Sequence, residues 1–209
     1  MSYPEFWIIA GPNGAGKTTC VKTKPIADLL PDVDFLNPDE RTLFKLRSLS
    51  YQGFSDAPVD AQTRLFFASA DEVFEELKQA LADNRKVGVE TVLSSDKYRS
   101  LVESTQRAGG IFCLVYVALS SPAIAQERVA ARVKRGGHGI PDDKIEQRWH
   151  RSLENLPWFV QRSTNFWVMD NSSSDPQSCP LLVASGKLGQ VELVDEHAFP
   201  EMKKALLAV

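Results

Sequence analysis

Residues Gly11 to Thr18, GPNGAGKT, have types and a spacing that suit the binding of phosphate groups. They match the pattern G-x-x-x-x-G-K-[ST], in which the glycines let successive backbone N–H groups turn toward one anion and the following helix adds its positive end. The lysine reaches the β and γ phosphates of a nucleotide, and the threonine hydroxyl binds the accompanying Mg²⁺. The nucleotide-binding residues predicted here are Gly11, Pro12, Asn13, Gly14, Ala15, Gly16, Lys17, Thr18 and Thr19, with Thr18 as the metal ligand.

Carboxylates follow two apolar runs that read as buried strands. Asp39 and Glu40 come just after VDFLN at 33–37, and Glu90 ends the apolar part of KVGVETVL at 86–93. A carboxylate beside a phosphate site can accept the proton of a hydroxyl that attacks the phosphate, although a carboxylate that follows a strand can also cap a helix.

A basic segment, about 121–156, could cover bound phosphates. Ser121 and Pro122 predict the start of a helix and Gly136 its end, and on that helix Arg128, Arg132 and Arg135 share one face. The glycine-rich joint RGGHGIP follows, and its bending would let the segment close as a lid. A solvated basic face is the structural alternative.

A second helix is predicted from Pro141 onward. Its core face is expected to consist of Ile145, Trp149, Leu153 and Leu156, with Arg148 outside that face. The residues expected to contact a phosphate acceptor are Asn37, Glu90, Ser94, Lys97, His138 and Arg148.

Strands and helices alternate along the chain. The predicted strands are 6–10, 33–37, 86–93, 111–119 and 165–170, and the clearest helix is 61–84, with Leu65, Phe66, Ser69, Val73, Leu77 and Leu81 on one face. This alternation predicts an α/β fold, the three-layer sandwich of P-loop NTPases, with a mostly parallel five-stranded sheet and helices on both faces. Residues 180–194 add an edge hairpin around Gly186, and a short helix follows from about Phe199.

Composition narrows the class of protein. The chain has 209 residues, 43% hydrophobic and 24% charged, which favours a single domain over 1–209. Its net charge of -3 provides no general attraction for nucleic acid or an anionic membrane, so neither is expected as a partner. Cys20, Cys113 and Cys179 are scattered, no apolar segment is long enough to span a bilayer, and no export signal is present, which indicates a cytoplasmic protein with reduced thiols.

Three classes of nucleotide protein share such a phosphate loop. A guanine-nucleotide switch is excluded because the chain lacks both Asn-Lys-x-Asp and Asp-x-x-Gly. A mechanical ATPase is disfavoured, because FWVMDN at 166–171 follows the lid in sequence; Asp170 or Asn171 is instead expected near the nucleotide base. A kinase remains, with a carboxylate for the acceptor proton and mobile cations over the phosphates.

Several segments together resemble the zeta-toxin family of P-loop kinases, over about residues 6–173. They are GPNGAGKTT, NPDE, ETVLSS, RVAARVKRGGHGIP, RWHRSLENL and DNS, in this order, with GGHGIP typical of the shorter branch. The resemblance implies a cytoplasmic ATP- and Mg²⁺-dependent kinase. The best-described members phosphorylate the 3′-hydroxyl of the sugar in UDP-N-acetylglucosamine and are held in check by a small antitoxin protein.

The resemblance also implies roles for individual residues. Asp39 would be the general base, Lys17 and Thr18 the phosphate and Mg²⁺ ligands, and Glu90 a carboxylate on the substrate or metal side. The lid arginines would be Arg128 and Arg132, while the choice of γ-phosphate contact among Arg128, Arg132 and Arg135 stays open. The founding toxins have a longer lid joint with an arginine where His138 falls, so the kinase chemistry is expected to transfer better than the substrate.

The sequence thus predicts a kinase that transfers the γ-phosphoryl group of ATP to a hydroxyl of a small molecule, such as a nucleotide sugar. The catalytic residues expected are Asp39, Lys17, Arg132 and Arg128, with Arg135 and Asn171 on the ATP side. The alternative is an ATP-binding regulatory or ATPase module whose lid closure controls a protein partner.

Overall fold

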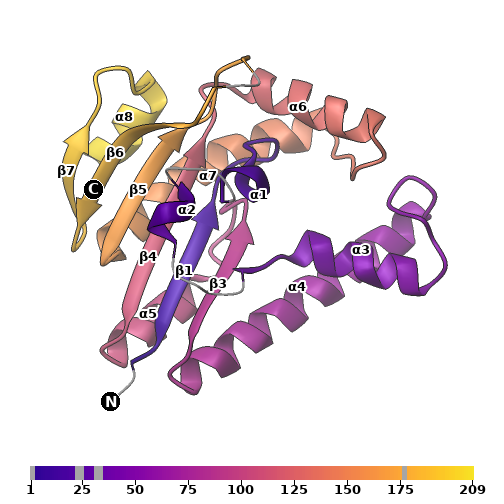
Figure 1. The fold of residues 1–209 in the computed structure, drawn as a ribbon, viewed down its shortest axis with the longest axis horizontal. Coiled ribbons are helices and arrows are strands. Elements are labelled where there is room, and N and C mark those ends of the chain that lie inside the picture. The colour runs from indigo at the N-terminus through magenta and orange to yellow at the C-terminus, as the bar shows by residue number, and fades with distance from the viewer. Residues whose placement is uncertain (1–2, 22–25, 31–34, 176–177) are drawn as a thin grey trace.

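The computed structural model describes residues 3–21, 26–30, 35–175 and 178–209. Its centre is a seven-stranded sheet of order β2-β3-β1-β4-β5-β6-β7 (Figure 1). The strands are β1 (Glu5–Ala10), β2 (Phe35–Leu36), β3 (Lys86–Thr91), β4 (Ile111–Ala118), β5 (Asn165–Asp170), β6 (Leu181–Lys187) and β7 (Gln190–Val194). The first five are parallel and the last two antiparallel, which confirms the predicted α/β class and parallel core. Residues 33–34 of the predicted second strand lie outside the described residues.

Helices cover both faces of the sheet, as the unbroken apolar runs of the strands require. They are α1 (Lys17–Cys20), α2 (Ile26–Leu29), α3 (Pro38–Ser48), α4 (Val59–Ala82), α5 (Arg99–Arg107), α6 (Pro122–Lys134), α7 (Asp142–Arg162) and α8 (Pro200–Leu207). In β1, Phe6 and Ile8 belong to a core cluster with α4, α5, α7 and α8, whereas Trp7 and Ile9 belong to a second cluster with α1 and α6. Because successive side chains of β1 point to opposite faces of the sheet, the strand contributes to a hydrophobic core on each face.

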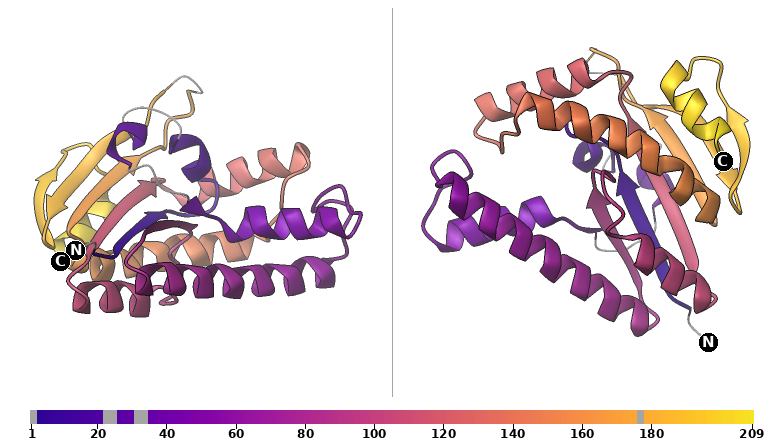
Figure 2. Two further views of the ribbon diagram at one scale, coloured as in Figure 1. Left: turned by 60° about the horizontal axis from the view of Figure 1, so that its bottom comes forward. Right: turned by 180° about the vertical axis from the view of Figure 1, so that it is seen from behind.

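Helices α3 and α4 form an arm that extends beyond the sheet (Figure 2). The outer part of the arm has its own small cluster, in which Leu46, Phe54 and Ala57 pack with Leu43 and Leu65. The Asn37 side chain begins α3 by accepting hydrogen bonds from the backbone N–H groups of Asp39 and Glu40, at 2.9 and 3.4 Å. The arm thereby fixes the position of Asp39 relative to the sheet.

The C-terminal hairpin is present, but its turn was misplaced by the sequence prediction. The turn is formed by Leu188 and Gly189, both at positive φ, and Gly186 lies within β6. Gly186 is needed there for space, because a Cβ atom would stand 2.0 Å from the carbonyl oxygen of Gln190. The final helix is α8, as predicted from about Phe199.

The predicted core positions of α7, Ile145, Trp149, Leu153 and Leu156, are all buried. Among the described residues, no helix has the length and apolarity that crossing a membrane requires. Cys20, Cys113 and Cys179 form no disulfide in the described part of the chain; the first two are buried and Cys179 is exposed.

Candidate active site

The phosphate loop joins β1 to α1 at the carboxyl edge of the sheet, where ligands of parallel sheets bind. Gly14 and Gly16 have φ of 75° and 80°, a left-handed conformation that favours glycine. The loop also packs closely against α6, since a Cβ atom on Gly14 would stand 2.9 Å from the carbonyl oxygen of Ala125. Any residue other than glycine at position 14 would therefore push α6 away from the loop.

Lys17 is a buried cation inside this loop. Its Nζ donates hydrogen bonds to the carbonyl oxygens of Gly11 (2.9 Å) and Pro12 (3.1 Å). Burial lowers the pKa of the Lys17 ammonium, and the nearby carboxylates of Glu90 and Asp39 partly oppose that shift. A phosphate group would supply the counter-charge that this ammonium has only in part.

Thr18 and Glu90 lie together below the loop. The Thr18 hydroxyl is 3.0 and 2.9 Å from the two carboxylate oxygens of Glu90 and donates a hydrogen bond to this group. Burial raises the pKa of Glu90, although Lys17 and the hydrogen bond from Thr18 pull it the other way. Hydroxyl and carboxylate oxygens are ligands that suit Mg²⁺, so this pair fits a metal ion bound beside phosphates.

A cavity of about 530 Å³ opens between the phosphate loop and the lid helix α6. Arg128, Arg132 and Arg135 all line it, so the three arginines do share the face predicted from their spacing. Arg128 donates to the carbonyl oxygen of Ser173 (2.8 Å) and Arg132 to that of His138 (2.9 Å). Anionic phosphates would compete for both guanidinium groups.

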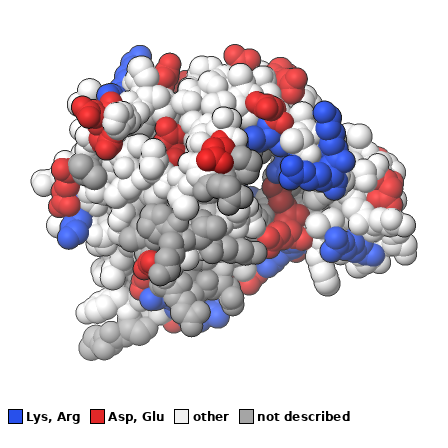
Figure 3. Space-filling model, turned by 45° about the horizontal axis from the view of Figure 1, so that its top comes forward, with Lys and Arg blue, Asp and Glu red and all other residues white. Residues whose placement is uncertain are grey.

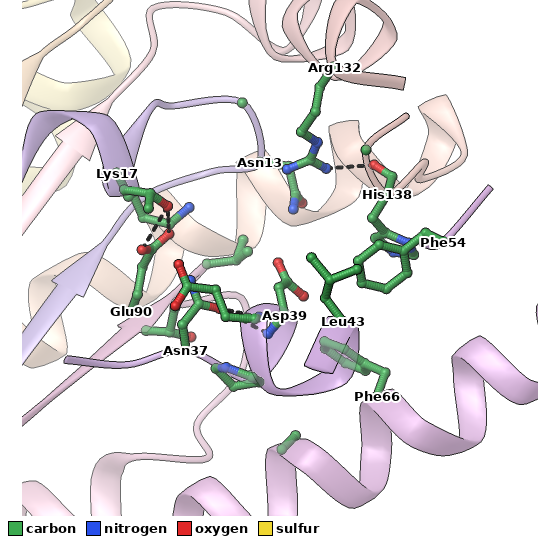
Figure 4. A pocket seen from close by; sticks show the side chains of 18 of the residues that line it. Asn13, Lys17, Asn37, Asp39, Leu43, Phe54, Phe66, Glu90, Arg132 and His138 are labelled. Atoms are coloured by element: carbon green, nitrogen blue, oxygen red, sulfur yellow. Dashed lines mark hydrogen bonds between the residues drawn. The ribbon is translucent and has the colours of Figure 1, made fainter. Parts of the chain in front are cut away.

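A second cavity of about 530 Å³ lies on the other side of the loop, beside the arm. Asp39 lines this cavity from the first turn of α3, and its side chain points toward the space below Asn13 (Figure 4). Arg148 on α7 also lines it; burial lowers the pKa of Arg148, and the charge of Asp39 opposes this. In the space-filling view, acidic side chains lie inside a hollow that basic side chains border (Figure 3).

The two cavities meet at a shared wall, and the residues that line both are Gly14, Lys17, Thr18, Glu90, Arg132 and Gly137. A phosphate bound by Lys17 would therefore be open to both cavities. Of the three lid arginines, only Arg132 borders both cavities, whereas Arg128 and Arg135 border only the cavity between the loop and α6. After the ligands that the sequence predicts, we call the cavity under α6 the phosphate cavity and the one beside the arm the acceptor cavity.

A sequence-family model described as AAA domain matches residues 6–156, most of the chain. The chain belongs to this family. The match contains the phosphate loop, Asp39, Glu90 and the lid, so the AAA domain supplies both cavities described above. A search of curated proteins gave no match.

Solved structures share the fold of this AAA domain. A chain of the AvrRxo1-ORF1:-ORF2 complex aligns with a TM-score of 0.69 and 16% identity, covering 98% of this chain and 64% of that chain. The same complex with ATP gives 0.66 and 15%, covering 92% and 61%. A chain of the PezAT chromosomal toxin-antitoxin system of Streptococcus pneumoniae gives 0.61 and 13%, covering 99% and 84%. This chain thus spans less than two thirds of the AvrRxo1 chains, and the likeness shows a common fold.

All six residues predicted for the acceptor side line the acceptor cavity: Asn37, Glu90, Ser94, Lys97, His138 and Arg148. Besides Glu90, which accepts a hydrogen bond from Thr18, two of these side chains have partners of their own. Lys97 donates to the carbonyl oxygen of Ala70 (3.0 Å) and pairs with Asp71 (2.9 Å), while the oxygen of the Asn37 side chain caps α3.

Some residues predicted to bind the nucleotide do not line either cavity. Asn171 lines neither cavity; its Nδ2 donates to the carbonyl oxygen of Ala15 (2.8 Å). Asp170 accepts hydrogen bonds from the backbone and hydroxyl of Ser172. Gly11, Pro12 and Ala15 are buried and are not among the lining residues of either cavity.

The sequence prediction missed the apolar wall of the acceptor cavity. Phe54, Phe66 and Tyr98 line it, together with the cation Arg47. The sequence prediction places Phe66 on the core face of its helix, but α4 continues past the sheet and there presents this ring to the cavity (Figure 4). The signal available in the sequence was the pair Phe66–Phe67, which makes the apolar stripe of α4 wider than a core contact requires.

Proposed function

We propose that this protein is an ATP-dependent phosphotransferase that transfers the γ-phosphoryl group of ATP to a hydroxyl of a small-molecule acceptor. The observation that carries the proposal is the wall shared by the two cavities, which Lys17 and Arg132 line on both sides while Asp39 lines only the acceptor side. A binding module needs no such arrangement, because it has no second substrate. The fold shared with a chain crystallised with ATP supports the choice of nucleotide.

The proposed reaction is a direct displacement. The oxygen of the acceptor hydroxyl attacks the γ-phosphorus of ATP and its proton passes to the carboxylate of Asp39. The bond between the γ-phosphorus and the β–γ bridging oxygen breaks, and ADP leaves. Lys17 and Arg132 stabilise the charge on the phosphoryl oxygens during transfer. Mg²⁺, for which Thr18 and Glu90 supply oxygen ligands, would neutralise part of the same charge.

The proposal extends to the organisation of the protein. Residues 1–209 form one kinase domain with about 121–156 as its lid, and Arg128 and Arg135 hold the outer phosphates when the lid closes. The acceptor cavity combines the aromatic rings of Phe54 and Phe66 with the cation Arg47. This combination suits a nucleotide sugar such as UDP-N-acetylglucosamine, in which a flat base and phosphates accompany the sugar hydroxyls.

A metabolite screen tests this function. The protein is incubated with ATP, Mg²⁺ and a pooled metabolite extract, with UDP-N-acetylglucosamine tested separately, and mass spectrometry follows any compound that gains one phosphate. We expect one acceptor to be phosphorylated at a hydroxyl while ADP accumulates in equal amount. ADP without any phosphorylated product would contradict the proposal and favour the ATPase or regulatory module.

One of the structural neighbours belongs to a toxin-antitoxin system, and this supports an antitoxin-like protein as partner of the proposed kinase. If the acceptor is a cell-wall precursor, expression of the protein should stop bacterial growth, whereas Asp39→Asn should not. Growth arrest by both proteins would assign the toxicity to something other than phosphotransfer.

A further inference from the structure

Asn13 is a buried amide within the phosphate loop. The residue is 6% exposed, and its Oδ1 has no hydrogen-bond partner among the described residues. Although it belongs to the phosphate loop, Asn13 lines the acceptor cavity and is absent from the lining of the phosphate cavity. Figure 4 shows its side chain pointing from the loop toward Asp39.

Unpartnered polar atoms concentrate at this cavity. In the described part of the chain, five buried side-chain nitrogen or oxygen atoms lack a partner: Asn13 Oδ1, Ser69 Oγ, Arg99 Nε, Arg132 Nε and His138 Nδ1. The residues Asn13, Arg132 and His138 line the acceptor cavity. Because buried polar groups are nearly always satisfied, this concentration indicates that a polar ligand completes the site.

The chemistry of Asn13 Oδ1 decides which ligand completes it. An amide oxygen only accepts hydrogen bonds, and so do the phosphate oxygens of ATP, so the nucleotide phosphates cannot satisfy this atom. The ionised carboxylate of Asp39, which faces the same space, also only accepts. A ligand that satisfies both of these acceptor groups must bring two donors.

We propose that Asn13 is a specificity-determining residue for the phosphate acceptor. Its Oδ1 accepts a hydrogen bond from a second donor, a hydroxyl or an N–H group, that stands next to the hydroxyl attacking ATP. The acceptor class is therefore a vicinal diol, an amino alcohol or an amide of one. This inference rests on the proposed function, because it needs the reacting hydroxyl to lie at Asp39.

The test compares wild-type protein with Asn13→Ala in the same metabolite extract with ATP and Mg²⁺. We expect the initial rate of the phosphorylated product to fall about tenfold, the effect of losing about one hydrogen bond at a buried site. Binding of a non-hydrolysable ATP analogue, the Mg²⁺ concentration for half-maximal rate, and the melting temperature should stay close to wild type. Gln79→Ala, which removes an exposed amide on α4, is the matched control and should leave all four measurements unchanged.

Three results would overturn the assignment. An unchanged rate in Asn13→Ala would show that the amide makes no contact with the acceptor. Parallel weakening of ATP-analogue or Mg²⁺ binding would place Asn13 on the nucleotide side. A phosphorylated product with no hydroxyl or N–H group next to its phosphate would show that the acceptor has no second donor for Asn13. If wild-type protein phosphorylates nothing, the proposed function falls and this role with it, so the wild-type and variant arms separate the two failures.

Discussion

At the scale of single residues, the candidate site depends on charges held out of water. Lys17, Glu90 and Arg148 all have pKa values shifted by burial toward their neutral forms, and in each case a charge of opposite sign partly restores the charged form. Asp39 is the carboxylate that influences both cations. Its replacement therefore affects charge balance as well as proton transfer.

Asp39→Asn removes the proposed proton acceptor and keeps the shape of the side chain. We expect the turnover number to fall by about 10² to 10⁴, the usual contribution of a general base, while the affinity for ATP changes little. Steady-state kinetics with the acceptor found in the screen, together with calorimetry of ATP-analogue binding, would check this. Wild-type turnover in the variant would exclude Asp39 as the base.

Glu90→Gln should change stability in a pH-dependent manner. Burial raises the pKa of Glu90 in the folded protein above its ordinary value of 4.5, so the unfolded chain releases this proton more readily. The contribution of Glu90 to stability is thus complete below that pH and is lost as pH rises through the folded pKa. The variant should gain stability over wild type as pH rises above the ordinary pKa of a glutamate and show no gain at lower pH.

Denaturant unfolding at a series of pH values measures this difference directly. Glu103→Gln, which alters an exposed carboxylate on α5, is the control. If the unfolding free energies of Glu90→Gln and wild type differ by the same amount at every pH, folding does not raise the pKa of Glu90.

At the scale of elements, helices α6 and α7 set the position of the lid relative to the ends of the strands. Helix α7 bonds to the segment after β3, because Ser152 Oγ donates to the carbonyl oxygen of Val92 (2.7 Å) and Asn155 Nδ2 to that of Leu93 (3.0 Å). Arg148 lies one turn before Ser152 on the same helix. The position of Glu90 on the sheet and that of Arg148 in the acceptor cavity are thereby fixed by one rigid element.

Helix α6 ends in a Schellman motif at the lid joint. The N–H of Gly136 donates to the carbonyl oxygen of Val133 (2.8 Å) and that of Gly137 to Arg132 (3.0 Å), with Gly136 at φ 84°. The two neighbouring glycines are needed for different reasons. A Cβ atom on Gly136 would meet nothing within 4 Å, whereas one on Gly137 would stand 2.5 Å from Cγ of Arg132.

Substitution of these glycines should separate stability from activity. Gly136→Ala strains a left-handed residue and should cost about 1 kcal/mol of unfolding free energy with little loss of turnover. Gly137→Ala displaces the Arg132 side chain and should lower turnover about tenfold, because a misplaced cation stabilises the transferring phosphoryl group less well. Thermal unfolding and kinetics of both variants test this; equal turnover in the two would contradict a role for Arg132 at the shared wall.

At the scale of the whole molecule, ligand binding should be visible as stabilisation. At a concentration 100 times its dissociation constant, an ATP analogue adds about 2.7 kcal/mol, which raises the melting temperature by about 5 to 10 °C in a chain of this size. Lys17→Ala should abolish the shift, because it removes the buried cation of the phosphate loop. A preserved shift in Lys17→Ala would show that ATP binds elsewhere.

The parts of the fold that follow from local sequence were predictable. The loop from Gly11 to Thr18, the parallel strands and the core face of α7 are each specified by residue type and spacing within one segment. Helix α3 was also predictable, because Asn37 and Pro38 are typical of a helix start. The sequence prediction instead assigns Asn37 to the end of a strand and to an acceptor contact.

The parts that depend on tertiary placement were not predictable. Asn171 donates a hydrogen bond to the carbonyl oxygen of Ala15, which is distant in sequence, and no local sequence pattern predicts that contact. The ring of Phe66 faces a cavity only because α4 extends beyond the edge of the sheet. The amide of Asn13 faces the acceptor cavity only because the loop turns around Lys17. Residue type alone allowed these side chains either of two orientations.

The shared wall between the phosphate and acceptor cavities also has a pharmacological consequence. Lys17 and Arg132 border both spaces. Under the proposed function, an adenosine polyphosphate joined covalently to a diol should therefore occupy both at once. Tethering makes the second binding event intramolecular, so such a bisubstrate inhibitor should bind more tightly than either half alone. The linker that works best would measure the path along which the phosphoryl group travels.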